Sequence, residues 1–493
     1  MDSQPFSSID AASGIDGLDH VLCGGFTPNR MYLLEGVPGS GKTTLAMQFL
    51  FAGVAAGEPV LYVSLSESLE ELRSVADSHG WSLDGVHIRE LLPQEESLQP
   101  EEQYTIFHPS EIELTETTSK ILADVDTLKP RRVVFDSLSE LRLLIGNSLR
   151  YRRQILALKQ YFTGRNCTVL LLDDLTATDR DLQVQSIAHG VISLHQMIPE
   201  YGADRRRLRV VKMRGKRYRG GYHDYAIRRG GLEVFPRVTA AEHRQPSTRV
   251  KMSSGIEGID ALLNGGIDRG TSTLLVGAPG TGKSSVAAQF ARTAAHAGHK
   301  AALFIFDESS ETLLGRMAGL GLDLRASVAA GAITIQQIDP AEMSPGEFAQ
   351  QLRYAVEEGG ASMIVIDSLN GYLNAMPEEH YLTIQLHELL TYLGQKGVAT
   401  ILIGAHQGLI GAQMQAPVDA SYLADTVILM RYFESRGEVR QSISVVKQRG
   451  GPHERTVREF TLDHAGIHVG EPLRQFRGVL TGVPVPEDEG ATG

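Results

Sequence analysis

Two short segments of the chain have the residue types and spacing that bind phosphate groups. Each follows the pattern G-x-x-x-x-G-K-S/T, at residues 36–43 and again at residues 277–284. In this pattern the glycines let backbone N–H groups converge on phosphate oxygens, the lysine reaches the β- and γ-phosphates, and the hydroxyl ligates Mg²⁺. We therefore predict two nucleotide sites, formed by Gly36, Gly39, Ser40, Gly41, Lys42, Thr43 and Thr44, and by Gly277, Gly280, Thr281, Gly282, Lys283, Ser284 and Ser285.

An acidic residue ends an apolar run in each half of the chain. These residues are Asp136 and Asp367, and both stand in the context Asp-Ser-Leu. A carboxylate at the end of a buried strand can hold Mg²⁺ beside a nucleotide loop, often through water. We predict that Asp136 acts with Thr43, and Asp367 with Ser284, to hold the metal. The alternative is that each aspartate caps a helix.

Nucleotide hydrolysis also needs a group that orients or deprotonates the attacking water. In this class of domain, that carboxylate tends to follow the second strand. The second half of the chain has Asp307 and Glu308 there, whereas the first half has Ser66 and Glu67. We predict Glu67, Asp307 and Glu308 as the catalytic acids. The alternative is that Glu67 and Glu308 are solvated acids at the start of a helix.

Each half also has two cations one residue apart, directly before a glycine. They are Lys212 and Arg214 in the first half, and Lys447 and Arg449 in the second. Residues two apart on a strand face the same side, so each pair can clamp a phosphate supplied by a neighbouring subunit. The alternative is an ordinary surface pair. The wider basic stretch from Arg205 to Arg229 could line a channel, bind nucleic acid or meet acidic neighbours, and we favour the last interpretation.

The elements that must position these residues follow one order in both halves. An apolar strand leads into each glycine loop, a helix follows, and further strands alternate with helices. Ser13–Asp19 recurs at Ser254–Asp260, and the loop lysines are likewise 283 − 42 = 241 positions apart. A repeat of this length indicates a duplicated domain, and the alternation indicates a mainly parallel sheet covered on both faces.

We therefore predict an α/β fold of two tandem P-loop NTPase domains. Each is expected to be a mainly parallel twisted sheet flanked by helices, with short antiparallel strands at its edge. The predicted domains span residues 1–240 and 241–475, and a flexible acidic tail follows at 476–493.

Composition narrows the class of protein. The formal net charge of −12 argues against nucleic acid as the main partner, because such binding usually needs a basic surface. The two cysteines, Cys23 and Cys167, have neither a second thiol nor a histidine at metal-ligand spacing, so we expect neither a disulfide framework nor a zinc site. No apolar run approaches the ~20 residues that span a bilayer, and the N-terminus has no secretory pattern. We expect a cytoplasmic protein.

Taken together, these motifs resemble those of the KaiC-like circadian clock ATPases and autokinases, within the RecA/DnaB-like superfamily. The resemblance extends from about Ser13 to about Arg477. It implies RecA-like domains, a homohexameric double ring with ATP between subunits, and a KaiB-like or signalling-kinase partner. It also implies slow ATP hydrolysis in the N-terminal domain and serine/threonine autokinase activity in the C-terminal one. The cation pairs would contact the nucleotide of the neighbouring subunit.

Three positions depart from the family pattern. Ser66 replaces the first catalytic glutamate of the N-terminal domain, and Asp307 is a methylene shorter than its counterpart. The family's Ser-Thr phosphoacceptor pair falls on Ser421 and Tyr422, which leaves Ser421 as the candidate phosphosite. Two other functions are alternatives: a DNA-dependent ATPase like other superfamily members, which the basic stretch favours, and a nucleotide-gated scaffold with negligible turnover, which Ser66 and Asp307 favour.

Overall fold

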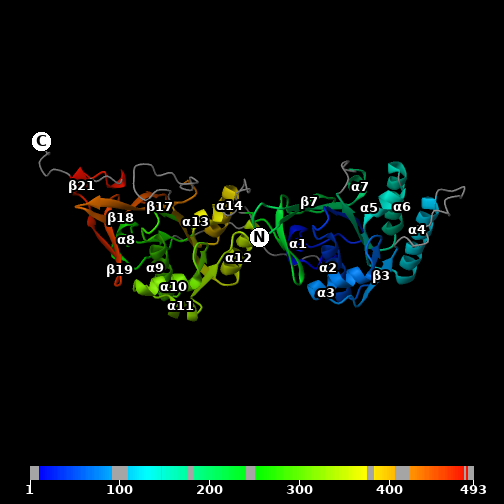
Figure 1. The fold of residues 1–493 in the computed structure, drawn as a ribbon, viewed down its shortest axis with the longest axis horizontal. Helices are drawn as coiled ribbons and strands as arrows, with labels where there is room; N and C mark the ends of the chain where they lie inside the picture. The colour runs from blue at the N-terminus through cyan, green and yellow to red at the C-terminus, as the bar shows by residue number, and fades with distance from the viewer. Residues whose placement is uncertain are drawn as a thin grey trace. The chain divides into compact units, whose positions relative to one another are not determined.

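The structure is a computed structural model of the chain. The chain divides into two compact units, Asp2–Arg237 and Val238–Gly493, both drawn in Figure 1. The residues that the structure describes are 10–91, 109–145, 147–175, 182–239, 250–374, 382–405, 422–481 and 485–486.

The first unit is built on a nine-stranded sheet in the order β3-β2-β4-β5-β1-β6-β7-β8-β9. Neighbours from β3 to β6 are parallel, and those from β6 to β9 are antiparallel. Since β1 lies between β5 and β6, the glycine loop that follows it leaves the middle of the sheet. The strands are β1 (Met31–Gly36), β2 (Val60–Ser64), β3 (Val86–Glu90), β4 (Arg132–Asp136), β5 (Thr168–Asp174), β6 (Gly190–Met197), β7 (Arg205–Met213), β8 (His223–Arg228) and β9 (Gly231–Phe235).

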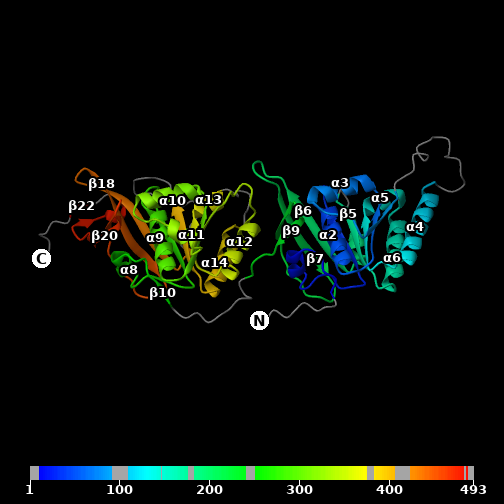
Figure 2. The same cartoon turned by 90° about the horizontal axis from the view of Figure 1, so that it is seen from below.

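Helices cover both faces of this sheet (Figures 1 and 2). Tyr32 and Leu34 belong to a buried cluster that includes α2, whereas Met31 and Leu33 belong to one that includes α6, because successive strand side chains point to opposite faces. A strand buried on both faces reads as a continuous apolar run, as β1 does. The helices are α1 (Asp16–Val21), α2 (Lys42–Ala55), α3 (Leu69–His79), α4 (Pro109–Leu128), α5 (Leu138–Ile145), α6 (Ser148–Thr163) and α7 (Leu182–Ile187).

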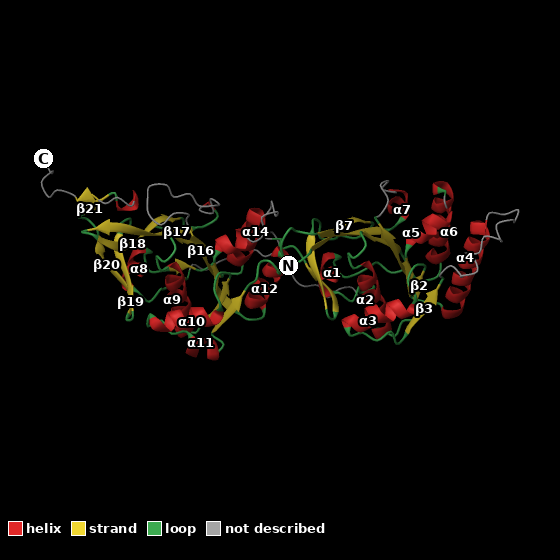
Figure 3. Ribbon diagram, in the orientation of Figure 1, coloured by secondary structure: helices red, strands yellow, loops and turns green. Residues whose placement is uncertain are grey.

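The second unit repeats this topology, with the order β14-β13-β15-β16-β12-β17-β18-β19-β20 (Figure 3). Its strands are β12 (Ser272–Gly277), β13 (Lys300–Ile305), β14 (Ile333–Gln337), β15 (Ala361–Asp367), β16 (Ala399–Ala405), β17 (Thr426–Ser435), β18 (Glu438–Gln448), β19 (Arg458–Asp463) and β20 (Gly466–Pro472). Its helices are α8 (Glu257–Leu262), α9 (Lys283–His296), α10 (Ser310–Gly319), α11 (Arg325–Ala329), α12 (Pro345–Glu357), α13 (Leu369–Asn374) and α14 (Leu382–Gln395). Two small pairs, β10 (Lys251–Met252) with β11 (Ile267–Asp268) and β21 (Phe476–Arg477) with β22 (Val485–Pro486), and the 3-10 helix η5 (Val479–Thr481) complete it.

The predicted fold class is confirmed, since both sheets are mainly parallel over their first six strands and carry helices on both faces. The antiparallel strands, however, are not short. β17 has 10 residues and β18 has 11, and they form one long hairpin. Its turn, Arg436-Gly437, has φ values of 56° and 75°, which suit the tight two-residue connection between twisted strands. The prediction missed this length because the strands continue through charged, half-exposed residues.

Arg132, at the start of β4, ties several parts of the first unit together. Its side chain is buried and forms an ion pair of 2.5 Å with Glu58. It also donates to the carbonyls of Ala12 and Phe49, at 2.6 and 2.7 Å. The guanidinium of Arg132 therefore connects the segment before α1, the helix α2 and the strand β4. Removal of this cation would leave three acceptors without their hydrogen-bond donor.

Arg132→Met tests this role, because it keeps an unbranched, flexible side chain in the buried site but removes every hydrogen bond. We expect it to lower the free energy of unfolding of the first unit by ~3 kcal/mol, since it breaks a buried pair from one side. Urea unfolding of the full chain measures this. Arg165→Ala is the control, because its ion pair with Asp126 is exposed and should contribute less than ~1 kcal/mol. Equal losses in the two variants would contradict the assignment.

Among the residues that the structure describes, no helix combines the length and apolar character needed to cross a bilayer.

Candidate active site

The first glycine loop joins the end of β1 to the start of α2. Gly41 has a φ of 90°, which L-residues other than glycine rarely adopt, and it turns the chain into the helix at Lys42. A Cβ atom on Gly36 would lie 2.9 Å from the carbonyl oxygen of Leu194. The loop is therefore held so close to β6 that only glycine fits, and its backbone forms a cradle at a helix N-terminus, which suits a phosphate.

The second loop has the same construction. Gly282 has a φ of 90°, and a Cβ on Gly277 would lie 2.1 Å from the carbonyl oxygen of Met430. The side chains of Ser40 and Thr281 each donate to a carbonyl three residues earlier, at 2.7 and 2.9 Å, and so close the two loops in the same way.

Both loop lysines are buried. Lys42 Nζ donates to the carbonyls of Gly36 and Val37 at 2.9 and 3.0 Å, and Lys283 Nζ donates to those of Gly277 and Ala278 at 2.9 and 2.8 Å. Burial lowers the pKa of Lys283 to about 8. A buried ammonium whose hydrogen bonds go to neutral carbonyls, as those of Lys283 do, favours an anionic ligand.

The remaining loop residues line the same turns. Gly39 and Gly280 have φ values of 79° and 81°, and a Cβ on Gly280 would lie 2.6 Å from the hydroxyl of Tyr432. Thr44 and Ser285 are buried in the first turns of α2 and α9.

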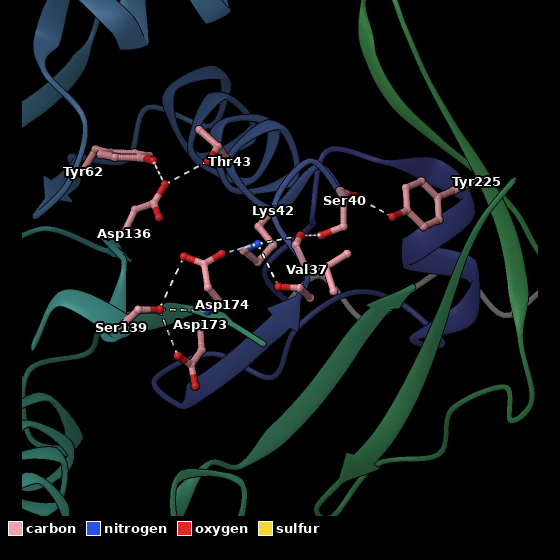
Figure 4. Close-up of polar contacts among 11 residues, drawn as sticks. Val37, Ser40, Lys42, Thr43, Tyr62, Asp136, Ser139, Asp173, Asp174 and Tyr225 are labelled. Atoms are coloured by element: carbon pink, nitrogen blue, oxygen red, sulfur yellow. Dashed lines mark hydrogen bonds and ion pairs between the residues drawn. The ribbon is translucent and has the colours of Figure 1, made fainter. Parts of the chain in front are cut away.

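Asp136, at the end of β4, lies beside the first loop (Figure 4). Its Oδ2 accepts hydrogen bonds from Thr43 at 3.0 Å and from the hydroxyl of Tyr62 at 2.5 Å. Burial raises the pKa of Asp136 above its usual range. A buried carboxylate next to a threonine hydroxyl supplies the hard oxygen ligands that Mg²⁺ prefers, so these residues fit the predicted metal.

Asp367 occupies the matching place at the end of β15. It accepts a hydrogen bond from Ser284, and burial, followed by the nearby charges of Glu308 and Asp307, raises its pKa. Each of the two aspartates is joined to the next serine by a cis peptide bond. The sequence thus predicted both hydroxyl–carboxylate pairs, and the structure brings the members of each pair together.

Glu67 follows β2 and faces the same site. Two hydrogen bonds to Ser64 hold its backbone in place. The N–H of Glu67 donates to Ser64 Oγ at 3.0 Å, and that hydroxyl donates to the Glu67 carbonyl at 2.6 Å. Its Oε2 is buried and has no hydrogen-bond partner among the described residues. Burial, then the charges of Asp136, Glu71 and Asp174, raise the pKa of Glu67 to about 7. A carboxyl group with this pKa can exchange a proton near neutral pH.

The two acids of the second unit are held differently. Asp307 Oδ2 accepts a hydrogen bond of 2.6 Å from Ser368, the residue after Asp367. Glu308 forms an ion pair with Arg316 of α10. Glu308 is therefore restrained by a cation. Within the part of the chain that the structure describes, the corresponding Glu67 has no such ion pair, because Val75 stands in the first unit where Arg316 stands in the second.

The cation pairs and the glycine loops lie at opposite ends of the strands of each sheet. Lys212 and Arg214 donate to the consecutive carbonyls of Gln185 and Ser186 in α7. The register places Lys212 beside Val191, whereas the end of β1 at Gly36 lies level with Leu194.

Lys447 and Arg449 repeat this arrangement and donate to the carbonyls of Ala424 and Tyr422 at 2.7 and 3.2 Å. Both members of each pair thus reach the same segment. The structure does not bring either pair to the glycine loop of its own unit.

Two further polar side chains reach the first site and were not predicted from the sequence. Asp174, the last residue of β5, forms an ion pair of 2.6 Å with Lys42 (Figure 4). The second is Tyr62, the phenol that donates to Asp136. The signal for Asp174 was present, because an acid ends an apolar run there just as at Asp136.

Four cations of the basic stretch are matched with acidic neighbours in their own unit, in agreement with the interpretation that the sequence favoured. Ion pairs join Arg206 to Asp204, Arg207 to Asp224, Lys216 to Asp10 and Arg228 to Glu233. The candidate phosphosite Ser421 lies outside the described residues, as do residues 487–493 of the predicted tail.

Comparison with known proteins agrees with this geometry. The family model described as "ATPase: KaiC" matches residues 11–239 and again residues 252–474. The chain belongs to the KaiC family of ATPases. It is 26% identical to the circadian clock protein KaiC3 of Synechocystis sp., over 96% of this chain and 94% of that one. The circadian clock oscillator protein KaiC of Parathermosynechococcus lividus is 26% identical over 96% and 87%, and that of Synechococcus elongatus 26% over 95% and 91%.

The raised pKa of Glu67 gives a pH prediction for this KaiC-family protein without nucleotide. Because the pKa is about 7 rather than the ordinary 4.5, the carboxyl group should be protonated at pH 6 and ionised at pH 8. The folded state binds this proton more tightly than the unfolded state, so the group destabilises the fold as the pH rises from about 4.5 to about 7.

Infrared difference spectra of wild type against Glu67→Gln measure the protonation directly. The carboxylic acid band should be present at pH 6 and absent at pH 8. The control is the difference spectrum of wild type against Glu311→Gln, which changes an exposed glutamate in the first turn of α10 and should lack the pH-dependent band assigned to Glu67. A Glu67 band already absent at pH 6 would contradict the prediction.

Proposed function

We propose that this protein binds ATP in both glycine loops and hydrolyses it in at least the first. The observation that carries this proposal is the pairing, in each unit, of a buried loop lysine with a hydroxyl–carboxylate pair at the end of a neighbouring strand. Membership of the KaiC ATPase family supports it. The preference for adenine comes from the family and not from these contacts.

In the proposed reaction the protein positions and neutralises phosphate charge. Lys42 and Lys283 exchange their loop carbonyls for phosphate oxygens, and the loop amides hold the rest. Mg²⁺, when bound, neutralises charge that builds up on the phosphates, and Thr43 with Asp136, or Ser284 with Asp367, would hold it. Glu67 is placed to accept a proton from the attacking water, and its pKa of about 7 suits that transfer.

The second unit uses Asp307 and Glu308 in this proposal. Ser368 fixes the carboxylate of Asp307 and Arg316 fixes that of Glu308. Two carboxylates held in place can orient a serine hydroxyl and accept the proton that it loses as the γ-phosphoryl group is transferred and ADP leaves, which is consistent with phosphoryl transfer to a hydroxyl as the second unit's activity.

Lys42→Ala and Lys283→Ala test the two sites separately. Each should abolish Mg·ATP binding at its own loop and reduce the stoichiometry from two sites per chain to one, because the buried ammonium supplies the main positive charge there. Isothermal titration calorimetry of the full chain measures both affinity and stoichiometry. Lys300→Ala, an exposed lysine on β13, is the matched control and should leave both values unchanged. Two sites of unaltered affinity in Lys42→Ala would refute the role of that residue.

We further propose that the chain assembles as a homohexamer in which each cation pair contacts the nucleotide of the neighbouring subunit. The location of the pairs supports this. Lys212 lies four residues along β7 from Leu208, which is level with the glycine loop, and four strand residues span about 13 Å. A lysine this far from its own loop does not reach the phosphates bound there, which supports a contact with the loop of another chain. A KaiB-like protein or a signalling kinase is the proposed partner class.

The C-terminal unit is proposed to transfer the γ-phosphoryl group to Ser421. Arg449, one of the proposed nucleotide-contacting cations, donates to the carbonyl of the adjacent Tyr422, so the chain beside Ser421 is attached to the same cation. If Arg449 contacts a neighbouring subunit's nucleotide, Tyr422, the residue that follows Ser421, would lie close to that nucleotide.

Incubation with γ-labelled ATP, followed by mapping of labelled peptides, tests the transfer. Label should appear on Ser421, and it should be lost in Ser421→Ala and in Lys283→Ala. Lys42→Ala should keep the label, because it alters only the first site. Release of free phosphate without any label on protein would leave an ATPase and remove the autokinase proposal.

A further inference from the structure

The first loop lysine has an anionic partner within its own chain. Lys42 Nζ lies 2.6 Å from Asp174 Oδ1, in addition to its two loop carbonyls. Lys42 is 7% exposed and Asp174 is 27% exposed, so the ion pair is only partly screened by water. Figure 4 shows the Asp174 carboxylate pointing at the ammonium from the end of β5.

Asp174 is held in this position by its neighbours. Its backbone N–H donates to Ser139 Oγ at 3.1 Å, and the same hydroxyl lies 3.4 Å from Asp174 Oδ2. The adjacent Asp173 is fixed by an ion pair of 2.7 Å with Arg142. The position of the Asp174 carboxylate is therefore fixed by hydrogen bonds and an ion pair at the end of β5.

The second unit has the same backbone arrangement without the carboxylate. Gly36 is aligned with Asp174 in the sheet register, and Gly277 is aligned with Ala405. The hydrogen bond to the strand end also recurs, because the N–H of Ala405 donates to Asn370 at 2.7 Å. The two units thus differ at one equivalent position by one negative charge, next to the lysine that both of them use.

We propose that Asp174 is an affinity-setting residue of the first site, which competes with nucleotide for Lys42 and makes that site bind triphosphates more weakly than the second. This inference rests on the proposed function, in which Lys42 binds phosphate. A triphosphate has to take the ammonium away from Asp174, and the displaced carboxylate then faces the phosphates at close range. The cost of breaking the ion pair is the same for both nucleotides, but the repulsion grows with the negative charge of the ligand, so the penalty is larger for ATP than for ADP.

The test removes the charge of Asp174 in the full chain with the second site silenced by Lys283→Ala. Calorimetry with Mg·ATP and Mg·ADP then reports the first site alone. Asp174→Asn and Asp174→Ala should each tighten Mg·ATP binding by about tenfold, the order expected for one partly screened charge pair, and tighten Mg·ADP binding less. Asp126→Asn removes an exposed charge from α4 of the same unit and should leave both affinities unchanged.

The reciprocal change tests the same idea in the other unit. In a Lys42→Ala background, Ala405→Asp should weaken Mg·ATP binding at the second site. Unchanged or weaker Mg·ATP binding in both Asp174→Asn and Asp174→Ala would overturn the inference. Nucleotide binding that survives in the double variant Lys42→Ala/Lys283→Ala would instead overturn the proposed function, so the two failures can be told apart.

Discussion

A buried lysine at the start of the helix that follows the central strand is the constraint that organises each unit. An ammonium in such a place is costly unless polar groups surround it, and Lys42 and Lys283 are each held by two carbonyls of their own loop. Those carbonyls converge only because glycines permit the close turn against β6 or β17. The parallel strands around β1 and β12 then bring Asp136 and Asp367 to the same edge, since parallel strands end on one side of a sheet.

The two units share this frame but differ in their charge. The first site holds the acids Glu67, Asp136 and Asp174, and the second holds Asp307, Glu308 and Asp367. Both sites therefore hold three acids. The first site has Ser66 in place of one acid, and Asp174, which comes from another strand and contacts the lysine, restores the number. Arg316 restrains the second site's glutamate, whereas the first site's glutamate has a pKa near neutrality. Duplicated domains of one fold can in this way support different affinities and different steps of phosphoryl transfer.

Much of the site could be predicted from sequence because its parts lie in local patterns. The glycine spacing identifies a loop, and an acid after an apolar run identifies a strand end. The lengths of β17 and β18 could not be predicted, because their outer halves are stabilised by pairing with each other rather than by an alternating apolar face. The location of the cation pairs also could not be predicted from local sequence patterns. The side of the sheet at which a strand ends depends on whether the strand is parallel or antiparallel to its neighbours.

The sequence by itself determined that two α/β units each have a phosphate-binding loop, a hydroxyl and a strand-end acid, because these depend on backbone freedom and on hydrophobic periodicity within a few residues. Only the tertiary structure decided which charges meet. Asp174 and Lys42 are 174 − 42 = 132 residues apart in the chain. They become partners because β5 lies beside β1 in the sheet. An electrostatic contact depends on distance in space, and the order of the strands sets that distance.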